Sequence, residues 1–175
     1  MKRGISDLIA TVLLIVITVA AVGIIYAAIM PLIRGQIETS QKCGSAGIEI
    51  ISEGGYTCYD PGTKEVKIQI QRGESNVDIA GLQLQVAGGG KSKSVEINST
   101  TSLIYVKEYG GSYSSVLTLP AKNEARTYVI KITDSAVGIT APESVSVAPI
   151  VKIGAQNKIC GISSQVPLFG LSCAH

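Results

Sequence analysis

The stretch that decides the fold is MKRGISDLIATVLLIVITVAAVGIIYAAIMPLI, residues 1–33. Residues 8–33 contain no charged side chain. At ~1.5 Å per helical residue this run extends for roughly 39 Å, which is enough to cross a bilayer with some tilt. Lys2 and Arg3 precede the run, so the positive-inside rule keeps the N-terminus in the cytoplasm. The residues after Arg34 are therefore predicted to lie outside the cell.

Two ordinary interpretations of this segment are a secretory signal peptide and a plain membrane anchor. A signal peptide has an apolar region of roughly 7–15 residues, followed by a cleavage site with small residues. This run is longer, and the only candidate site, Ala27-Ala28, lies inside it. A plain anchor fits the length but does not account for the polar residues Ser6 and Asp7 at its start.

The residues Arg3-Gly4-Ile5-Ser6, followed by the long apolar run, resemble the class III signal peptide of archaeal type IV pilins. The resemblance covers residues 2 to about 33. It implies that a prepilin peptidase cuts between Gly4 and Ile5 on the cytoplasmic side and leaves the helix in the mature protein. The chain would then comprise a leader, 1–4, a hydrophobic helix, 5–42, and an extracellular domain, 43–175.

One position departs from the related bacterial pattern. Bacterial type IV pilins carry a glutamate at the fifth mature position, where this chain has Ile9, and the only early acid here is Asp7. Asp7 could supply the counter-charge that a buried N-terminal amine needs. The alternative is that Ser6 and Asp7 cap the helix and interact with its dipole, and we favour this second interpretation.

The resemblance implies a structural subunit rather than an enzyme, the major pilin of an archaeal adhesive filament. Its partners would be further copies of itself, the prepilin peptidase and assembly machinery, and the membrane before assembly. Alternatives are an archaellin of a motility filament, or a membrane-anchored, lectin-like binding domain that never polymerises. We predict that assembly uses side chains along the helix, namely Asp7, Leu8, Val12, Ile15, Val19 and Pro31.

The charge balance agrees with an assembled exterior protein. The chain has 15 basic and 13 acidic residues, and loss of Lys2 and Arg3 leaves 13 of each. No basic stripe remains for binding nucleic acid by counterion release. A neutral surface also resists self-association less than a strongly charged one.

After residue 47 the pattern changes to a period of two, which is typical of strands with one buried face. Turn signals rich in glycine, proline and asparagine separate these segments. Seven or eight short strands predict an immunoglobulin-like β-sandwich, so the fold class is α+β. The alternating apolar residues are Val66, Ile68, Ile70, Leu82, Leu84, Val86, Tyr128, Ile130, Ile132, Val145 and Val147. Residues 150–153 extend the last strand or start another.

Four cysteines, Cys43, Cys58, Cys160 and Cys173, follow the apolar run. An even number in an exterior domain predicts two disulfides. Their order favours two local pairs, Cys43–Cys58 and Cys160–Cys173. The alternative joins Cys43 or Cys58 to Cys160 or Cys173 and connects the two ends of the domain. A zinc site is disfavoured because the spacings are wide and no CxxC occurs.

No pattern of a catalytic or cofactor-binding site is present. The only histidine is His175, the last residue, so a Ser-His or Cys-His pair is not expected. Residues 88–94, GGGKSKS, lack the spacing of a phosphate loop and are predicted to form a hairpin turn. Asn98 begins an Asn-Ser-Thr sequence that is an N-glycosylation acceptor motif.

Overall fold

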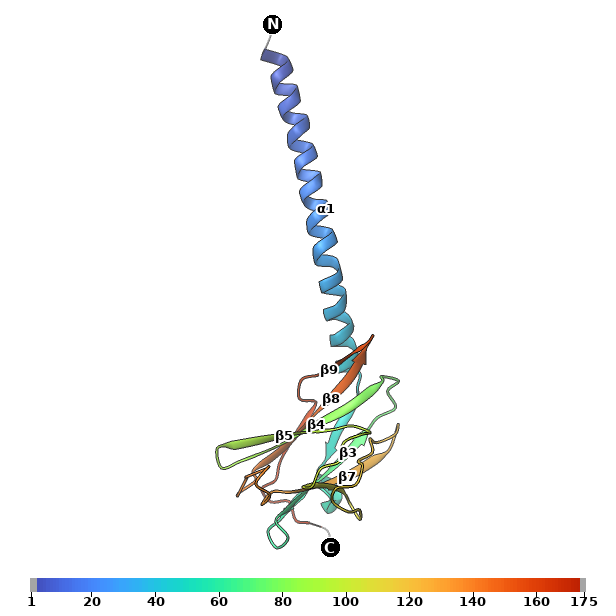
Figure 1. Cartoon of the computed structure of the whole chain (residues 1–175), viewed down its shortest axis with the longest axis vertical. Coiled ribbons are helices and arrows are strands. Elements are labelled where there is room, and N and C mark those ends of the chain that lie inside the picture. Colours follow the sequence, from blue (N-terminus) through green and yellow to red (C-terminus); the bar gives the residue numbers. More distant parts are fainter. Residues whose placement is uncertain (1–2, 174–175) are drawn as a thin grey trace. The chain divides into compact units, whose positions relative to one another are not determined.

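The computed structural model describes residues 3–173, with the backbone alone for residues 3–8. Helix α1 (Arg3–Gly44) is 42 residues long and includes Pro31 in its interior. Figure 1 shows it as one continuous helix. It ends at Gly44, two residues beyond the predicted end at residue 42. Two compact units make up the chain, Met1–Ser40 and Gln41–His175. We call the second unit the β domain.

The β domain is a sandwich of two five-stranded antiparallel sheets, so the predicted α+β class is confirmed. Ten short strands form it, more than the seven or eight expected. The first sheet comprises β1 (Ile48–Ile51), β2 (Cys58–Asp60), β3 (Glu65–Arg72), β6 (Val106–Glu108) and β7 (Ala125–Lys131). The second comprises β4 (Ile79–Gly88), β5 (Lys91–Ile97), β8 (Ser144–Ile153), β9 (Gln156–Ile159) and β10 (Ser164–Pro167). The strand order is β1-β3-β7-β6 in the first sheet, where β2 also pairs with β3, and β10-β8-β4-β5 in the second, where β9 also pairs with β8.

The predicted period of two is confirmed in the strands that form the core. In β3, Val66, Ile68 and Ile70 are fully buried and alternate with more exposed polar residues. The inward side chains of β4, β7 and β8 pack against them in one apolar cluster. This burial stabilises the sandwich because each large aliphatic side chain contributes about 1.5–3 kcal/mol on removal from water.

Residues 150–153 extend the preceding strand, so β8 is a single long strand with Pro149 in its interior. A proline in a central strand usually disrupts pairing because it has no N–H to donate. Here the partner of β8 changes from β10, which pairs with residues 144–147, to β9, which pairs with residues 150–153. The Pro149 carbonyl accepts a hydrogen bond from Cys160 N on this side. Pro149, which lacks a backbone N–H, therefore lies between the residues of β8 that pair with β10 and those that pair with β9.

The predicted turns lie between the strands. Gly89 and Gly90 have φ angles of 60° and 73° and close the β4–β5 hairpin, as a two-residue turn of the type I′ kind requires. The short 3-10 helix η1 (Glu53–Gly55) leads into β2. At the β2–β3 turn, Asp60 Oδ1 accepts hydrogen bonds from the backbone N–H groups of Gly62 and Thr63.

Candidate functional site

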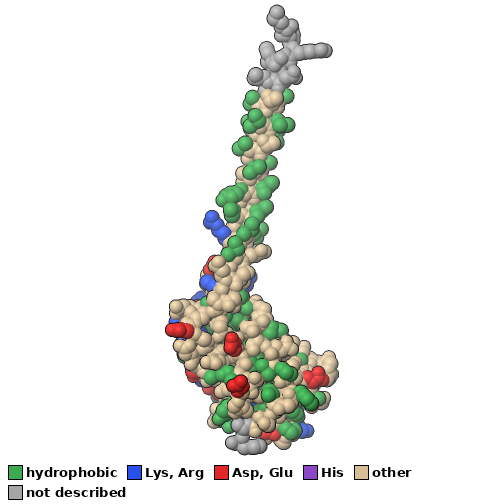
Figure 2. Space-filling view, turned by 180° about the vertical axis from the view of Figure 1, so that it is seen from behind, with side chains coloured by type: hydrophobic (Ala, Val, Ile, Leu, Met, Phe, Trp, Pro, Cys, Tyr) green, Lys and Arg blue, Asp and Glu red, His purple; other side chains and the backbone are tan. Residues whose placement is uncertain are grey.

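The largest unburied apolar surface in the described chain is that of α1. Val12, Ile15 and Val19, three of the predicted assembly residues, are 53%, 59% and 67% exposed. Residues 12–17 are all apolar and all exposed, and six consecutive residues cover the whole circumference of a helix. Hydrophobic side chains lie along the face of the helix in view in Figure 2.

This surface needs cover from outside the chain. The segment Ile9–Gly44 is long and apolar enough to cross a membrane, and none of its apolar window is buried within the chain. Burial of each aliphatic side chain is worth about 1.5–3 kcal/mol, so the exposed helix is unfavourable in water. Only lipid or other apolar protein surfaces can supply that cover.

The predicted processing residues lie at the start of the helix. Gly4 and Ile5, and the predicted assembly residues Asp7 and Leu8, belong to the first turns of α1. Their side chains are outside the described part of the structure, as are Met1 and Lys2. Pro31 is in the helix interior, where its ring removes one backbone hydrogen bond.

All four cysteines are paired, but not in the local pattern that we favoured. The disulfides are Cys43–Cys160 and Cys58–Cys173, with sequence separations of 117 and 115 residues. The prediction of Cys43–Cys58 and Cys160–Cys173 was therefore wrong, and the alternative that joins the two ends of the domain is observed.

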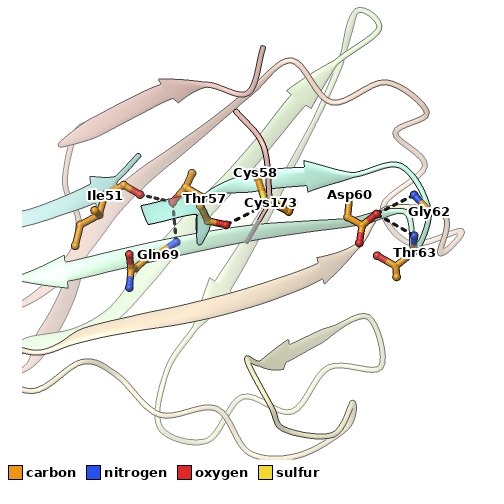
Figure 3. Close-up of a disulfide and its surroundings, with 9 residues drawn as sticks. Ile51, Thr57, Cys58, Asp60, Gly62, Thr63, Gln69 and Cys173 are labelled. Carbon is orange, nitrogen blue, oxygen red and sulfur yellow. Dashed lines mark hydrogen bonds between the residues drawn. A yellow bond between two sulfur atoms is a disulfide. The ribbon is translucent and has the colours of Figure 1, made fainter. Parts of the chain in front are cut away.

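The reason for this pairing is the contact between the first and last strands. β1 and β10 come from opposite ends of the β domain, and Ile50 N donates a hydrogen bond to Ser164 Oγ across them. Cys43 and Cys160 precede β1 and β10 in the chain and are bonded to each other. Cys58 and Cys173 follow these strands and form the second bond. Figure 3 shows Cys58 and Cys173 beside the buried Thr57, which accepts a hydrogen bond from Gln69 N.

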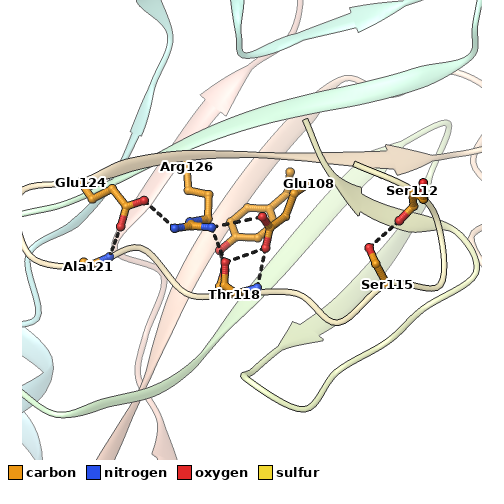
Figure 4. A network of polar contacts seen from close by, with 8 residues as sticks. Glu108, Ser112, Ser115, Thr118, Ala121, Glu124 and Arg126 are labelled. Atoms are coloured by element: carbon orange, nitrogen blue, oxygen red, sulfur yellow. Dashed lines mark hydrogen bonds and ion pairs between the residues drawn. The ribbon is translucent and has the colours of Figure 1, made fainter. Parts of the chain in front are cut away.

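A polar network holds the long connection that follows β6. The Arg126 guanidinium pairs with Glu108 at 3.1 Å and with Glu124 at 2.5 Å. Glu108 accepts hydrogen bonds from the backbone and side chain of Thr118. Glu124 accepts a hydrogen bond from Ala121 N. This bond and the nearby Arg126 guanidinium lower the pKa of the Glu124 carboxyl. Figure 4 shows that these contacts converge from the loop onto β7. The arrangement is a structural clamp on the loop.

Lysines and tyrosines cover the outward face of the first sheet. Lys107 Nζ lies 4.5 Å from the ring centroid of Tyr113, and Lys67 Nζ lies 5.5 Å from that of Tyr109. The rings of Tyr109 and Tyr56 pack edge to face, with centroids 5.7 Å apart. Cation–π contacts of this kind contribute about 0.5–1 kcal/mol when exposed.

Glu65 anchors this layer. Its carboxylate accepts a hydrogen bond from the Tyr113 hydroxyl at 2.5 Å and pairs with Lys107 at 3.1 Å. Burial alone raises the pKa of Glu65, but these two partners outweigh it and hold the pKa below its ordinary value. Burial and the bond to Glu65 both raise the pKa of Tyr113. Val129, which lies in register between Lys67 and Lys107, is 1% exposed, so the layer shields an apolar residue.

Asn98, the predicted glycosylation residue, lies directly after β5 and is partly exposed. Its Oδ1 accepts hydrogen bonds from Thr100 N at 3.0 Å and Thr100 Oγ1 at 2.8 Å, and its Nδ2 donates to Glu96. The acceptor motif is thus folded into a compact turn. Glycosylation of Asn98 stays a prediction.

Within the described residues, no three His, Cys, Asp or Glu side chains are grouped so that they could hold a metal ion. The sequence reasoning missed the tyrosine-lysine layer and the exposed Phe169, which is 96% accessible. Phe169 is the only phenylalanine of the chain and precedes a glycine, which could have marked it as a turn residue. No model of a known protein family matches the chain, and no curated protein matches it.

Proposed function

We propose that this chain is a structural subunit of a cell-surface filament of the archaeal type IV pilin kind. The observation that carries the proposal is α1, whose apolar side chains cover its circumference and are exposed. Before assembly, lipid would shield the helix. After extraction, only the helices of other copies offer equivalent cover.

The energetics favour a polymer. Burying some twenty aliphatic side chains at about 1.5–3 kcal/mol each amounts to tens of kcal/mol per subunit. A helix that is apolar on all sides can contact several neighbours at once. Heterologous contacts between copies generate a filament when the rotation between them does not close into a ring.

The processing site supports the same proposal. Arg3-Gly4-Ile5-Ser6 precedes the helix as in the pilins that it resembles. Cleavage after Gly4 would free the amine of Ile5 and remove both leader charges, Lys2 and Arg3. The resulting subunit enters a helical core without a basic leader that would have to be buried.

Substitution of a residue within the helix tests the proposal. Val16→Lys places a charge in the middle of the apolar run, at a cost of about 2.5–3.5 kcal/mol on insertion scales. Because this cost recurs in every subunit, we expect electron microscopy of sheared surface material to show no filaments. Ile104→Lys in the β domain, where Ile104 is already 67% exposed, is the matched control and should leave filaments intact.

Two outcomes would contradict the proposal. Abundant filaments of the Val16→Lys variant would remove α1 from the filament core. Wild-type chain recovered only as a monomer in the membrane would favour the anchored binding domain. N-terminal sequencing of wild-type filaments is expected to begin at Ile5.

A further inference from the structure

Phe169 is the most exposed large apolar side chain in the described part of the structure, at 96%. The next values are 70% for Ile24 in α1 and 67% for Ile104 in the β domain. Single exposed apolar residues are common on soluble surfaces. Full exposure of a phenylalanine within a constrained turn is uncommon, because an aromatic side chain offers about 150–250 Å² of surface for burial.

A tight turn presents this side chain. Leu171 N donates a hydrogen bond to Leu168 O, and Gly170 has a φ of 80°. These features match a type II turn with Gly170 at its third position. Phe169 therefore occupies the second position of the turn, and its side chain is exposed to solvent.

The turn is held on both sides. Leu168 is 5% exposed, packs into the core and donates its N–H to Glu143 O at 2.8 Å. Cys173 follows three residues after Gly170 and is bonded to Cys58. An aromatic side chain on a constrained backbone loses little conformational entropy on binding, which is a property of anchor residues in interfaces.

A hollow that suits one aromatic ring lies beside the turn. It has a volume of about 260 Å³. The almost fully buried Ile132 and Ile139 line it, and the more exposed residues around them are Tyr59, Lys64, Thr133, Gly138 and Thr140. Its volume falls just below the roughly 300–1,000 Å³ of small-molecule pockets. Tyr59 lines both this hollow and a second depression, which Phe169 and Leu168 also line. Phe169, which we call the knob, and the hollow are thus neighbours on one surface.

Both features lie at the end of the β domain remote from the point where the chain enters it. Gly47, near that point, accepts a hydrogen bond from Gly73 just beyond β3. Cys58 and Asp60 pair with Lys67 and Glu65 at the other end of the same strand. At about 3.3 Å per residue, the two ends are roughly 20–25 Å apart.

We propose that Phe169 of one copy inserts into the hollow lined by Ile132 and Ile139 of a second copy, and that the reverse contact forms at the same time. A two-fold arrangement can form both contacts at once because Phe169 and the hollow are adjacent on each chain. The charges are self-complementary as well, because exposed Lys64 lines the hollow and exposed Glu143 lies beside Phe169. Each lysine would face the glutamate of the other copy.

The contact would join filaments rather than extend them, and this inference rests on the proposed function. A two-fold contact closes on itself, so it cannot propagate the helical array. One aromatic side chain from each copy also buries far less than the roughly 1,000 Å² of a stable interface. Along two parallel filaments the contact repeats, and multivalency turns a weak pair into a stable association. The expected result is side-by-side bundles.

Bundling of intact filaments tests the proposal. Wild-type filaments examined by electron microscopy should form bundles, and Phe169→Ala should reduce them roughly tenfold or more because the loss repeats at every contact. Ile159→Ala removes a 57% exposed side chain from β9 and should bundle like the wild type. Thr140→Trp, which fills the hollow but keeps the knob, should also leave filaments single.

A mixture distinguishes a specific contact from a general loss of apolar surface. Phe169→Ala filaments keep the hollow, and Thr140→Trp filaments keep the phenylalanine. Each mixed contact can therefore make one of the two insertions, and the mixed sample should form bundles that join the two kinds, fewer than in the wild type but more than in either variant alone. Any one of three results would overturn the contact but not the proposed function. These are wild-type filaments that stay single, Phe169→Ala filaments that bundle normally, and a mixture that forms no bundles. Loss of binding to a foreign surface with unchanged bundling would overturn it and assign Phe169 to another partner. A wild-type chain that forms no filaments would overturn the proposed function, and this contact with it.

Discussion

At the scale of single residues, the most informative group is Glu65 with its two donors. Tyr113 and Lys107 both bind the same carboxylate oxygen, and both come from elements that follow Glu65 by more than forty residues. Their side chains cover the outward face of the first sheet above the buried Val129. The charge on Glu65 therefore stabilises the tertiary structure.

The acid dependence of stability tests this role. The pKa of Glu65 in the folded state is below its ordinary value of 4.5, so its contribution is present above pH 4.5 and is lost as the pH falls through the folded-state pKa. We expect Glu65→Gln to lower the free energy of unfolding by about 1 kcal/mol at pH 7, and the difference from the wild type to vanish in acid. Denaturant unfolding of the full chain in detergent, from pH 7 to pH 3, measures it. Glu49→Gln, at an exposed position of β1, is the control, and a constant difference at all pH values would contradict the assignment.

At the scale of elements, α1 and the β4–β5 hairpin depend on different things. The helix follows from its own apolar sequence and continues through Pro31. The hairpin depends on a neighbour, because a Cβ at Gly88 would lie 1.8 Å from Ala141 O and 2.7 Å from Pro142 Cα. The backbone of residues 141–142 can approach only because Gly88 has no side chain.

Substitution at this glycine should be severe. Gly88→Ala forces the two backbone segments apart and is expected to lower the free energy of unfolding by about 2–4 kcal/mol. Gly161→Ala, where nothing lies within 4 Å of the added carbon and φ is ordinary, should change it by less than about 1 kcal/mol. Thermal unfolding of both variants provides the comparison, and equal stability of the two would show that this close approach is not required.

At the scale of the whole molecule, two long-range disulfides connect the beginning of the β domain to its end. In the chain-entropy interpretation, closing a loop of about 115 residues removes more freedom from the unfolded chain than closing a loop of about 15 residues. The observed pairing therefore restrains the unfolded state more than the local pairing would. Neither bond involves the apolar run of α1 that we assign to assembly.

Removing one bond should separate stability from assembly. We expect the Cys58→Ser, Cys173→Ser double variant to lose about 2–5 kcal/mol of stability and still to form filaments, which proteases then digest at a lower temperature. Mass spectrometry of unreduced wild-type filaments should recover peptides linked as Cys43–Cys160 and Cys58–Cys173. A linked Cys43–Cys58 peptide would contradict the observed pairing, and loss of filaments would show that the β domain also controls assembly.

Local sequence patterns predict the parts of this protein that depend on neighbouring residues in the chain. A continuous apolar run specified α1, and alternation specified strands such as β3 and β4, because both periods reflect which face of a segment must leave water. Glycine pairs marked the turns for an equally local reason, since they permit positive φ. Short strands such as β6 and β9 lack enough residues to show a period.

Contacts between segments that are distant in the chain become apparent only in the folded protein. The cysteine pairing depends on the contact of β1 with β10, and the Glu65 cluster depends on the register of β3, β7 and β6. The exposure of Phe169 depends on Leu168 and Cys173 being held while the turn between them points outward. Each is a contact between residues far apart in the chain, and local pattern carries no information on which distant segment will supply the partner.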